Sequence, residues 1–126
     1  MTKDATLPSP DDKNEKPIEE QAREQTGQQQ VRIHVDEREM RTSYANAFRT
    51  NGTAEEVMLD FGLNLVAPPS QQQDKPEIIF RINDRVIMNY YSAKRLAITL
   101  SQLIRRHEEQ FGDLEMDVAK RRKDGL

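Results

Sequence analysis

The stretch VMLDFGLNLV, residues 57–66, decides the fold of this chain. Large apolar side chains occupy every second position in it: Val57, Leu59, Phe61, Leu63 and Leu65. Successive side chains of a strand point to opposite faces of a sheet, so this alternation predicts a strand with one buried face. Pro68 and Pro69 follow, and we expect them to end the strand because proline cannot donate to a sheet ladder.

Three further segments are predicted to be strands. VRIHVDE, from residue 31, and SYANAFRT, residues 43–50, precede the central stretch. Asn51-Gly52 is a turn signal within a connection of about six residues. EIIFRINDRVIMN, residues 77–89, offers one long strand bulged near Asn83-Asp84, or two short strands with a turn there. We favour the single strand because Asn-Asp is a poorer hairpin turn than Asn-Gly.

A helix is predicted after the fourth strand. Asn89 is a good N-cap, and Gly112 stands where helices commonly end. Between them, apolar residues recur at the helical period on one face: Ala93, Leu96, Leu100, Leu103, Ile104 and Phe111. The sequence therefore predicts an amphipathic helix whose apolar stripe covers one face of the sheet, the face made by Leu59, Phe61, Leu63, Phe80 and Ile82.

The order of elements predicts an α+β fold: an antiparallel sheet of about four strands, then one long C-terminal amphipathic helix packed on one face. The predicted core consists of sheet and helix residues: Leu59, Phe61, Leu63, Phe80, Ile82, Leu96, Leu100 and Leu103. One helix is about 10 Å wide and four strands span nearly ~20 Å. We therefore expect a second chain to share in covering the sheet.

Composition separates the chain into three regions. Residues 1–30 are rich in charge, proline and glutamine and are predicted to be a disordered N-terminal tail. Residues 31–112 are predicted to form a single α+β domain, and residues 113–126 a charged C-terminal tail. With 35% hydrophobic and 33% charged residues, the core of so small a domain is expected to be only marginally stable.

Composition also excludes several classes of site. The chain has no cysteine, which excludes disulfides, thiolate nucleophiles and cysteine-based metal sites. It has no apolar run of about 18 residues and no apolar stretch near its N-terminus, so we expect a cytoplasmic protein without a membrane span. Its net charge of −3 lies in residues 1–30, so the predicted domain is neutral and has no bulk attraction to nucleic acid.

Three motifs resemble a known family. The runs YANAFRTNGTAEEVMLDFG, RVIMNYYSAKRL and EEQFG are similar to those of the bacterial and archaeal domain of unknown function 3467, over roughly residues 40–112. The resemblance implies one continuous strand before the helix and supplies no reaction. Asn89-Tyr90-Tyr91 replaces the family's usual Ser-Pro at the helix start. The order of elements is also similar to that of the secretion chaperone SecB, an analogy of topology.

Residues that could carry chemistry are few. His34 and His107 lack the spacing of metal ligands, and we expect both to be structural or solvated. Glu55, Glu56 and Asp60 could form an acid–base set only in a pocket that shifts a pKa. Protective charge on a strand is the expected role instead. We therefore predict no catalytic residues, no cofactor and no metal, although an enzyme with an unrecognised site stays a third hypothesis.

Two surface features bear on partners. Tyr91, Ile98 and Arg105 form a line on the helix opposite its apolar stripe, a composition typical of an interface. Acidic residues flank Arg105 and Arg106 and surround the basic run Lys120–Lys123, so solubilising charge is expected rather than nucleic-acid binding. We predict a non-catalytic binding or assembly protein, a homo-oligomer (dimer or higher) that could bind protein clients as a chaperone does. A nucleic-acid accessory protein is the alternative.

Overall fold

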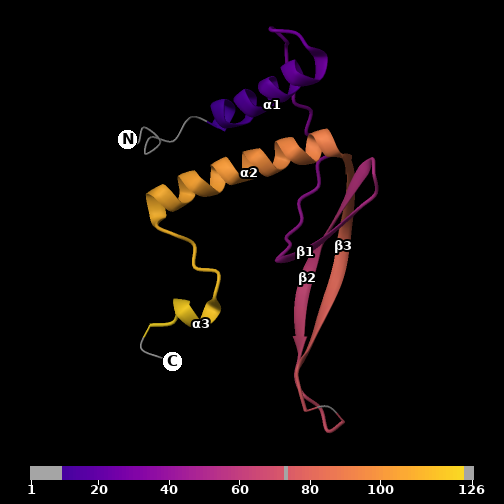
Figure 1. Ribbon diagram of the computed structural model, residues 1–126, viewed down its shortest axis with the longest axis vertical. Coiled ribbons are helices and arrows are strands. Elements are labelled where there is room, and N and C mark those ends of the chain that lie inside the picture. Colours follow the sequence, from indigo (N-terminus) through magenta and orange to yellow (C-terminus); the bar gives the residue numbers. More distant parts are fainter. Residues whose placement is uncertain (1–9, 73, 124–126) are drawn as a thin grey trace. The chain divides into compact units, whose positions relative to one another are not determined.

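The computed structural model describes residues 10–72 and 74–123, with side chains from residue 18 onward. Its elements follow in the order α1 (Pro10–Thr26), β1 (Ala47–Gly52), β2 (Glu56–Ala67), β3 (Glu77–Asn89), α2 (Tyr90–Phe111) and α3 (Val118–Arg121) (Figure 1). The chain divides into two compact units. Val35–Lys94 contains the sheet, and the described residues outside that range contain α1, most of α2 and α3.

The sheet is antiparallel with the strand order β1-β2-β3, so the VMLDFGLNLV stretch lies in the central strand. Strand β2 runs from Glu56 to Ala67 and ends before the two prolines. The α+β class, the antiparallel sheet and the helix that follows it are confirmed. The sheet has three strands among the described residues rather than about four.

The predicted first strand is the one that the structure does not form. Residues 31–46 contain no strand, and β1 begins only at Ala47. Val31 and Ile33 are half-buried while Arg32 and His34 are exposed, so the alternation is present without a ladder. Apolar side chains at every second position indicate an extended segment, but a strand also needs a neighbouring backbone to pair with. The alternation therefore did not suffice to predict a strand.

The connection between β1 and β2 is shorter than predicted. Asn51 and Gly52 belong to β1, and only residues 53–55 separate the strands. The Thr53 hydroxyl accepts hydrogen bonds from the backbone N–H groups of Glu55 and Glu56, each at 3.2 Å. The Thr53 N–H donates to the Glu56 carbonyl at 2.9 Å. A threonine-centred turn therefore replaces the expected Asn-Gly turn.

Strand β3 is one long strand with a bulge, as predicted. Phe61 pairs with Asp84, and the next residue, Gly62, pairs with Ile82, so Asn83 is the extra residue. A bulge of this kind inserts one residue and shifts the alternation of the strand that carries it. Beyond Asn83, the side chains of β3 therefore change faces relative to those of β2.

This change of face corrects the predicted sheet surface. Directly paired residues lie on the same face of a sheet. Phe80 pairs with Asn64 and Ile82 with Gly62, so both lie on the face opposite Leu59, Phe61 and Leu63. The prediction that all five share one face is wrong because Asn83 was counted into an unbroken alternation. We call the two sides the Leu59 face and the Asp60 face.

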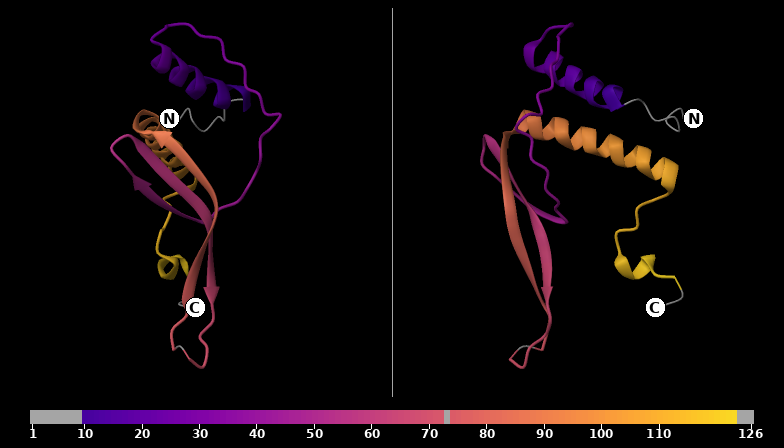
Figure 2. Two further views of the ribbon diagram at one scale, coloured as in Figure 1. Left: turned by 90° about the vertical axis from the view of Figure 1, so that its right-hand side faces the viewer. Right: turned by 180° about the vertical axis from the view of Figure 1, so that it is seen from behind.

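The far half of the β2–β3 hairpin is two-stranded. Strand β1 pairs with β2 only between Val57 and Gly62. Beyond Gly62, β2 and β3 continue toward their connecting loop without a third strand (Figures 1 and 2). We call this part, residues 63–67 and 77–82, the arm. A two-stranded hairpin alone is only marginally stable in water.

Helix α2 begins and ends where the sequence predicts. The Asn89 side chain accepts a hydrogen bond from the Ser92 N–H at 2.8 Å, as an N-cap does. Gly112 has a φ of +91°, and its N–H donates to the Glu108 carbonyl at 2.8 Å. A left-handed glycine of this kind commonly ends helices. The Tyr90 hydroxyl also donates to the Thr53 carbonyl at 2.8 Å, which ties the helix start to the β1–β2 turn.

The N-terminal region contains a helix that the sequence did not predict. Helix α1, Pro10–Thr26, lies within the region that composition predicts to be a disordered tail, and that prediction stays untested. Proline suits the first turn of a helix, and Glu19 and Arg23 have the spacing of a favourable pair. Gly27, with a φ of +73°, ends the helix by donating to the Arg23 carbonyl at 2.8 Å. Residues 1–9 lie outside the described residues.

The single chain has no buried apolar core among its described residues. Of the predicted core residues, Leu59, Phe61, Leu63 and Phe80 are half-buried. The others are exposed, namely Ile82, Leu96, Leu100 and Leu103. The packing of the helix on the sheet stays a prediction.

Candidate functional site

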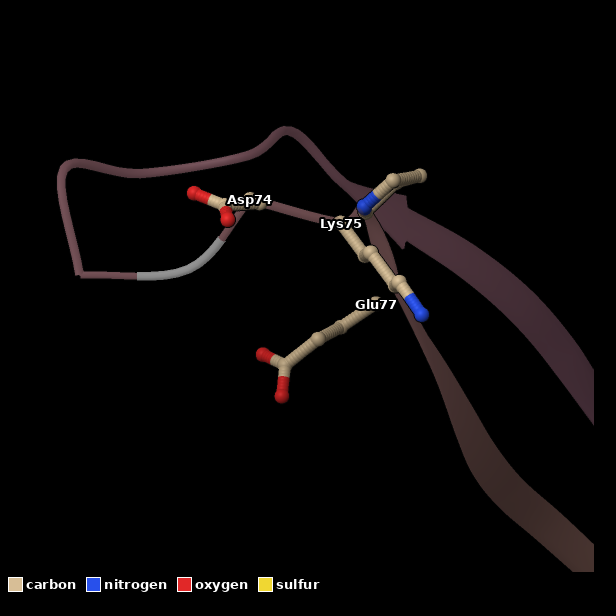
Figure 3. Close-up of a pocket in the computed structure, with 4 residues that line it drawn as sticks. Asp74, Lys75 and Glu77 are labelled. Atoms are coloured by element: carbon tan, nitrogen blue, oxygen red, sulfur yellow. The ribbon is translucent and has the colours of Figure 1, made fainter.

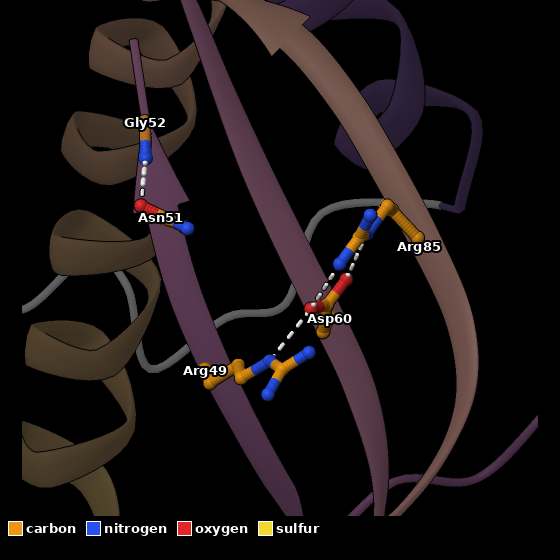
Figure 4. A network of polar contacts seen from close by, with 5 residues as sticks. All are labelled: Arg49, Asn51, Gly52, Asp60 and Arg85. Carbon is orange, nitrogen blue, oxygen red and sulfur yellow. Dashed lines mark hydrogen bonds and ion pairs between the residues drawn. The ribbon is translucent and has the colours of Figure 1, made fainter.

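Three charged side chains meet on the Asp60 face, one from each strand (Figure 4). Asp60 pairs in register with Arg49 on β1 and with Arg85 on β3. The Arg85 side chain donates two hydrogen bonds to the Asp60 carboxylate, from Nε at 2.7 Å and from Nη2 at 3.0 Å. The Arg49 Nε donates a third at 2.8 Å. We call this group the Arg–Asp–Arg clamp.

Asp60 is 2% exposed and is the one charged side chain that is buried among the described residues. The two hydrogen bonds from Arg85, followed by the one from Arg49, lower the pKa of the Asp60 carboxyl far below its ordinary value of 3.8. Burial acts in the opposite direction and is outweighed. In return, the Asp60 carboxylate raises the pKa of Arg85. The clamp is therefore an ion cluster with all three groups charged at neutral pH.

This geometry decides what Asp60 can do chemically. A general acid or base needs a pKa near the working pH, and the Asp60 pKa is shifted away from neutrality. Both carboxylate oxygens are already hydrogen-bonded to guanidinium groups. The clamp therefore connects the three strands rather than supplying a proton-transfer group.

The two arginines of the clamp were missed at the sequence level. Arg49 and Arg85 lie 11 and 25 residues from Asp60 along the chain. Neither spacing reveals the pairing, because it depends on the short turn at residues 53–55 and on the bulge at Asn83. The available signal was ambiguous: β1 offers Arg49 and β2 offers Asp60, but β3 offers Arg81 and Asp84 as well as Arg85. Only the strand register places Arg49, Asp60 and Arg85 opposite one another.

The other candidate acids and histidines do not join the clamp. Glu55 lies in the β1–β2 turn and Glu56 begins β2, and both are exposed. His34 is exposed and lies outside the sheet unit. His107 stacks on Phe111, with ring centroids 4.9 Å apart. In the part of the chain that the structure describes, no three His, Asp or Glu side chains are grouped as metal ligands.

Described residues line hollows on the surface, two of which bear on function. One, of about 330 Å³, lies at the end of the arm and is lined by Asp74, Lys75, Pro76 and Glu77, whose charged side chains diverge (Figure 3). Since its lining comes from four successive residues, it is a fold of the loop rather than a built site.

The second hollow is an open groove of about 580 Å³ between α1 and α2, lined mainly by charged and polar residues. Within it, the Arg95 Nε donates to the Glu24 carboxylate at 2.7 Å. Ile98 and Arg105, two of the three predicted interface residues, line this groove together with Glu20. Helix α1 of the same chain therefore lies beside part of the predicted interface line. Tyr91, the third residue, is exposed in the sheet unit, and the interface role of the line stays a prediction.

The basic residues of the helical unit have acidic neighbours. Arg105 and Arg106 share the groove with Glu109. The Arg121 Nε donates to the backbone carbonyl of Glu115 at 2.7 Å, which ties helix α3 to the residues just before it. Among the described residues, no helix has the length and apolar character needed to cross a membrane.

Comparison with known proteins places the chain in a family. No curated protein matches it, and no solved structure matches it, so the analogy with SecB is not confirmed. The family model described as "Protein of unknown function (DUF3467)" matches residues 10–116. This range contains α1, the three strands and α2. The chain therefore belongs to the DUF3467 family, as the motifs in YANAFRTNGTAEEVMLDFG and EEQFG predicted.

Proposed function

We propose that the protein is a non-catalytic assembly module that works as a homo-oligomer. The observation that carries the proposal is that no apolar side chain is buried among the described residues of the single chain. Fully burying one large apolar side chain contributes about 2 kcal/mol. A typical domain has a net stability of only ~5–15 kcal/mol. A chain that leaves all its large apolar side chains partly exposed needs further burial, and another copy can supply it.

The distribution of exposed apolar residues supports assembly. They are concentrated on β3 and α2 rather than scattered singly: Ile78, Ile79, Ile82, Val86, Ile87, Leu96, Ile98, Leu100, Leu103 and Ile104. On β3, Ile78, Ile82 and Ile87 lie on the Asp60 face, and Ile79 and Val86 lie on the Leu59 face. Exposed apolar patches commonly mark protein interfaces.

The state of the clamp supports a non-catalytic role. Asp60 is the strongest candidate for a reactive group, because it is a buried acid with a shifted pKa. Two guanidinium groups hold it as a carboxylate, and its three hydrogen bonds connect the strands. The clamp thus serves to keep the sheet rigid enough to present a surface.

Sedimentation equilibrium of the full chain tests the proposal. The chain mass is 14.6 kDa, and we expect a fitted mass of at least twice that value at micromolar concentration. A mass of one chain across the whole concentration range, together with cooperative unfolding, would contradict the proposal. Cooperative unfolding would show that the monomer stabilises itself.

A further inference from the structure

The Asp60 face of the arm carries an apolar patch without charge. The patch consists of Val66 on β2 and Ile78, Phe80 and Ile82 on β3. Val66 is 68% exposed and Ile78 67% exposed, and these two residues pair directly across the strands. Val66 and the three β3 residues share this face because the bulge at Asn83 brings the β3 side chains to it. We call these four residues the arm patch.

The opposite side of the arm has a different character. On the Leu59 face, Arg81 pairs with Leu63 and Glu77 with Ala67, so both charged residues of the arm strands lie there. On the patch side, Asn64 is the other arm residue of β2, and Gly62 and Asp60 follow it on the same face outside the arm. The two faces of the arm thus differ, with charge on one and only apolar and small polar groups on the other.

We propose that the arm patch is the contact surface between two copies of this chain, packed face to face about a two-fold axis. This inference rests on the proposed function and names the surface that serves it. The four patch residues carry no charge, and the nearest charged side chains on this face are the clamp residues beyond Gly62. The surface that covers the patch itself is therefore expected to be apolar. A second arm patch has that chemistry, and a two-fold interface uses the same surface on both chains.

A two-fold dimer is a closed assembly, and this favours a second copy of the chain over another apolar partner. An exposed apolar patch beside unpaired strand edges invites open-ended aggregation. The outer edge of β3, and the edge of β2 beyond Gly62, have no strand partner among the described residues. Isologous packing buries both patches against each other and leaves neither available for further addition. Sheets that pack in this way lie about 10 Å apart, a distance that interleaved Ile and Phe side chains fill.

The absence of cysteine from the sequence allows a direct test. Ile78→Cys places a single thiol in the arm patch. Ile79→Cys places one on the next residue, which is 53% exposed and lies on the opposite face. Val118→Cys on α3, where the wild-type side chain is 61% exposed, is a second control. Each full-length variant is treated with a short bismaleimide at a concentration where the wild-type protein is oligomeric.

We expect covalent dimers of Ile78→Cys to form at least tenfold faster than those of either control. We also expect Ile78→Lys to raise the dissociation constant of the oligomer at least tenfold, and Ile79→Lys to raise it much less. If the protein is an oligomer in which Ile78→Cys cross-links no faster than Val118→Cys, the arm patch is not the contact surface, while the proposed function is unaffected. If Ile79→Cys cross-links faster than Ile78→Cys, the contact lies on the Leu59 face, and the assignment to the arm patch is wrong. A wild-type protein that sediments as a monomer would remove both proposals.

Discussion

At the scale of single residues, the sheet depends on one buried carboxylate. Asp60 receives hydrogen bonds from arginines of both neighbouring strands, and its own side chain is 2% exposed. The Arg49 and Arg85 side chains are 57% and 50% exposed, so removing the carboxylate takes away three charge-assisted hydrogen bonds and leaves two guanidinium groups that water can reach. Exposed pairs contribute little. Asp36 and Arg38, which form an exposed pair at 2.6 Å, provide the internal comparison.

Replacing Asp60 with asparagine should destabilise the fold. Asp60→Asn keeps the shape of the side chain but removes the negative charge between Arg49 and Arg85, so we expect the thermal midpoint to fall by several degrees. Asp36→Asn should leave the midpoint unchanged within error. Circular dichroism at one protein concentration measures both. Equal midpoints for the two variants would show that the clamp contributes no more than a surface pair.

The same carboxylate predicts a dependence on pH. The Asp60 pKa is lower in the folded chain than its ordinary value of 3.8. Its stabilising contribution is therefore complete above about pH 5 and is lost as the pH falls from there toward the folded-state pKa. The wild-type midpoint should decline more steeply below pH 4 than that of Asp60→Asn, which carries no titrating group there. Parallel declines would contradict the assignment.

At the scale of elements, Gly62 and the bulge at Asn83 determine which side chains of β3 lie on each face of the arm. A Cβ atom at Gly62 would lie 2.8 Å from the Arg81 carbonyl carbon and 2.9 Å from the Ile82 Cα, with the Arg81 oxygen closer still. These are backbone atoms, so no side-chain rotation relieves the contact. Gly62 therefore allows β3 to approach β2 where Asn83 is inserted.

Gly62→Ala should consequently disrupt the arm. We expect it to lower the free energy of unfolding by about 3 kcal/mol or more. Gly52→Ala is the matched control: its Cβ would meet the Tyr90 hydroxyl at 2.5 Å, the end of a side chain that can rotate. Its expected cost is about 1 kcal/mol. Urea titrations at one protein concentration compare them, and a Gly62→Ala variant as stable as Gly52→Ala would show that the backbones separate easily.

The elements also show which parts of the fold could be predicted. The proline-terminated β2, the single β3 and the caps of α2 depend on neighbouring residues, so their local signals sufficed. The unformed strand at residue 31 and the shared face of Phe80 and Ile82 depend on pairing partners. Alternation within one segment contains no information about partners. The clamp was missed for the same reason, because its arginines meet Asp60 only through the register.

At the scale of the whole molecule, the sequence predicted an apolar surface larger than one chain could cover. That prediction assumed about four strands, whereas the sheet has three among the described residues, and it stays a prediction. The described residues contain no buried apolar side chain. We therefore expect folding and association to be one process, because the burial that stabilises the chain is supplied by another copy. When a partner binds the folded state and not the unfolded state, the unfolding midpoint rises with the concentration of that partner.

The most direct measurement is therefore the thermal midpoint as a function of protein concentration. We predict that the midpoint of the full chain rises by several degrees between about 1 and 100 µM, and that Ile78→Lys lowers it at each concentration. A cooperative transition whose midpoint stays constant over this range would contradict the account. It would mean that one chain folds and stabilises itself without a partner.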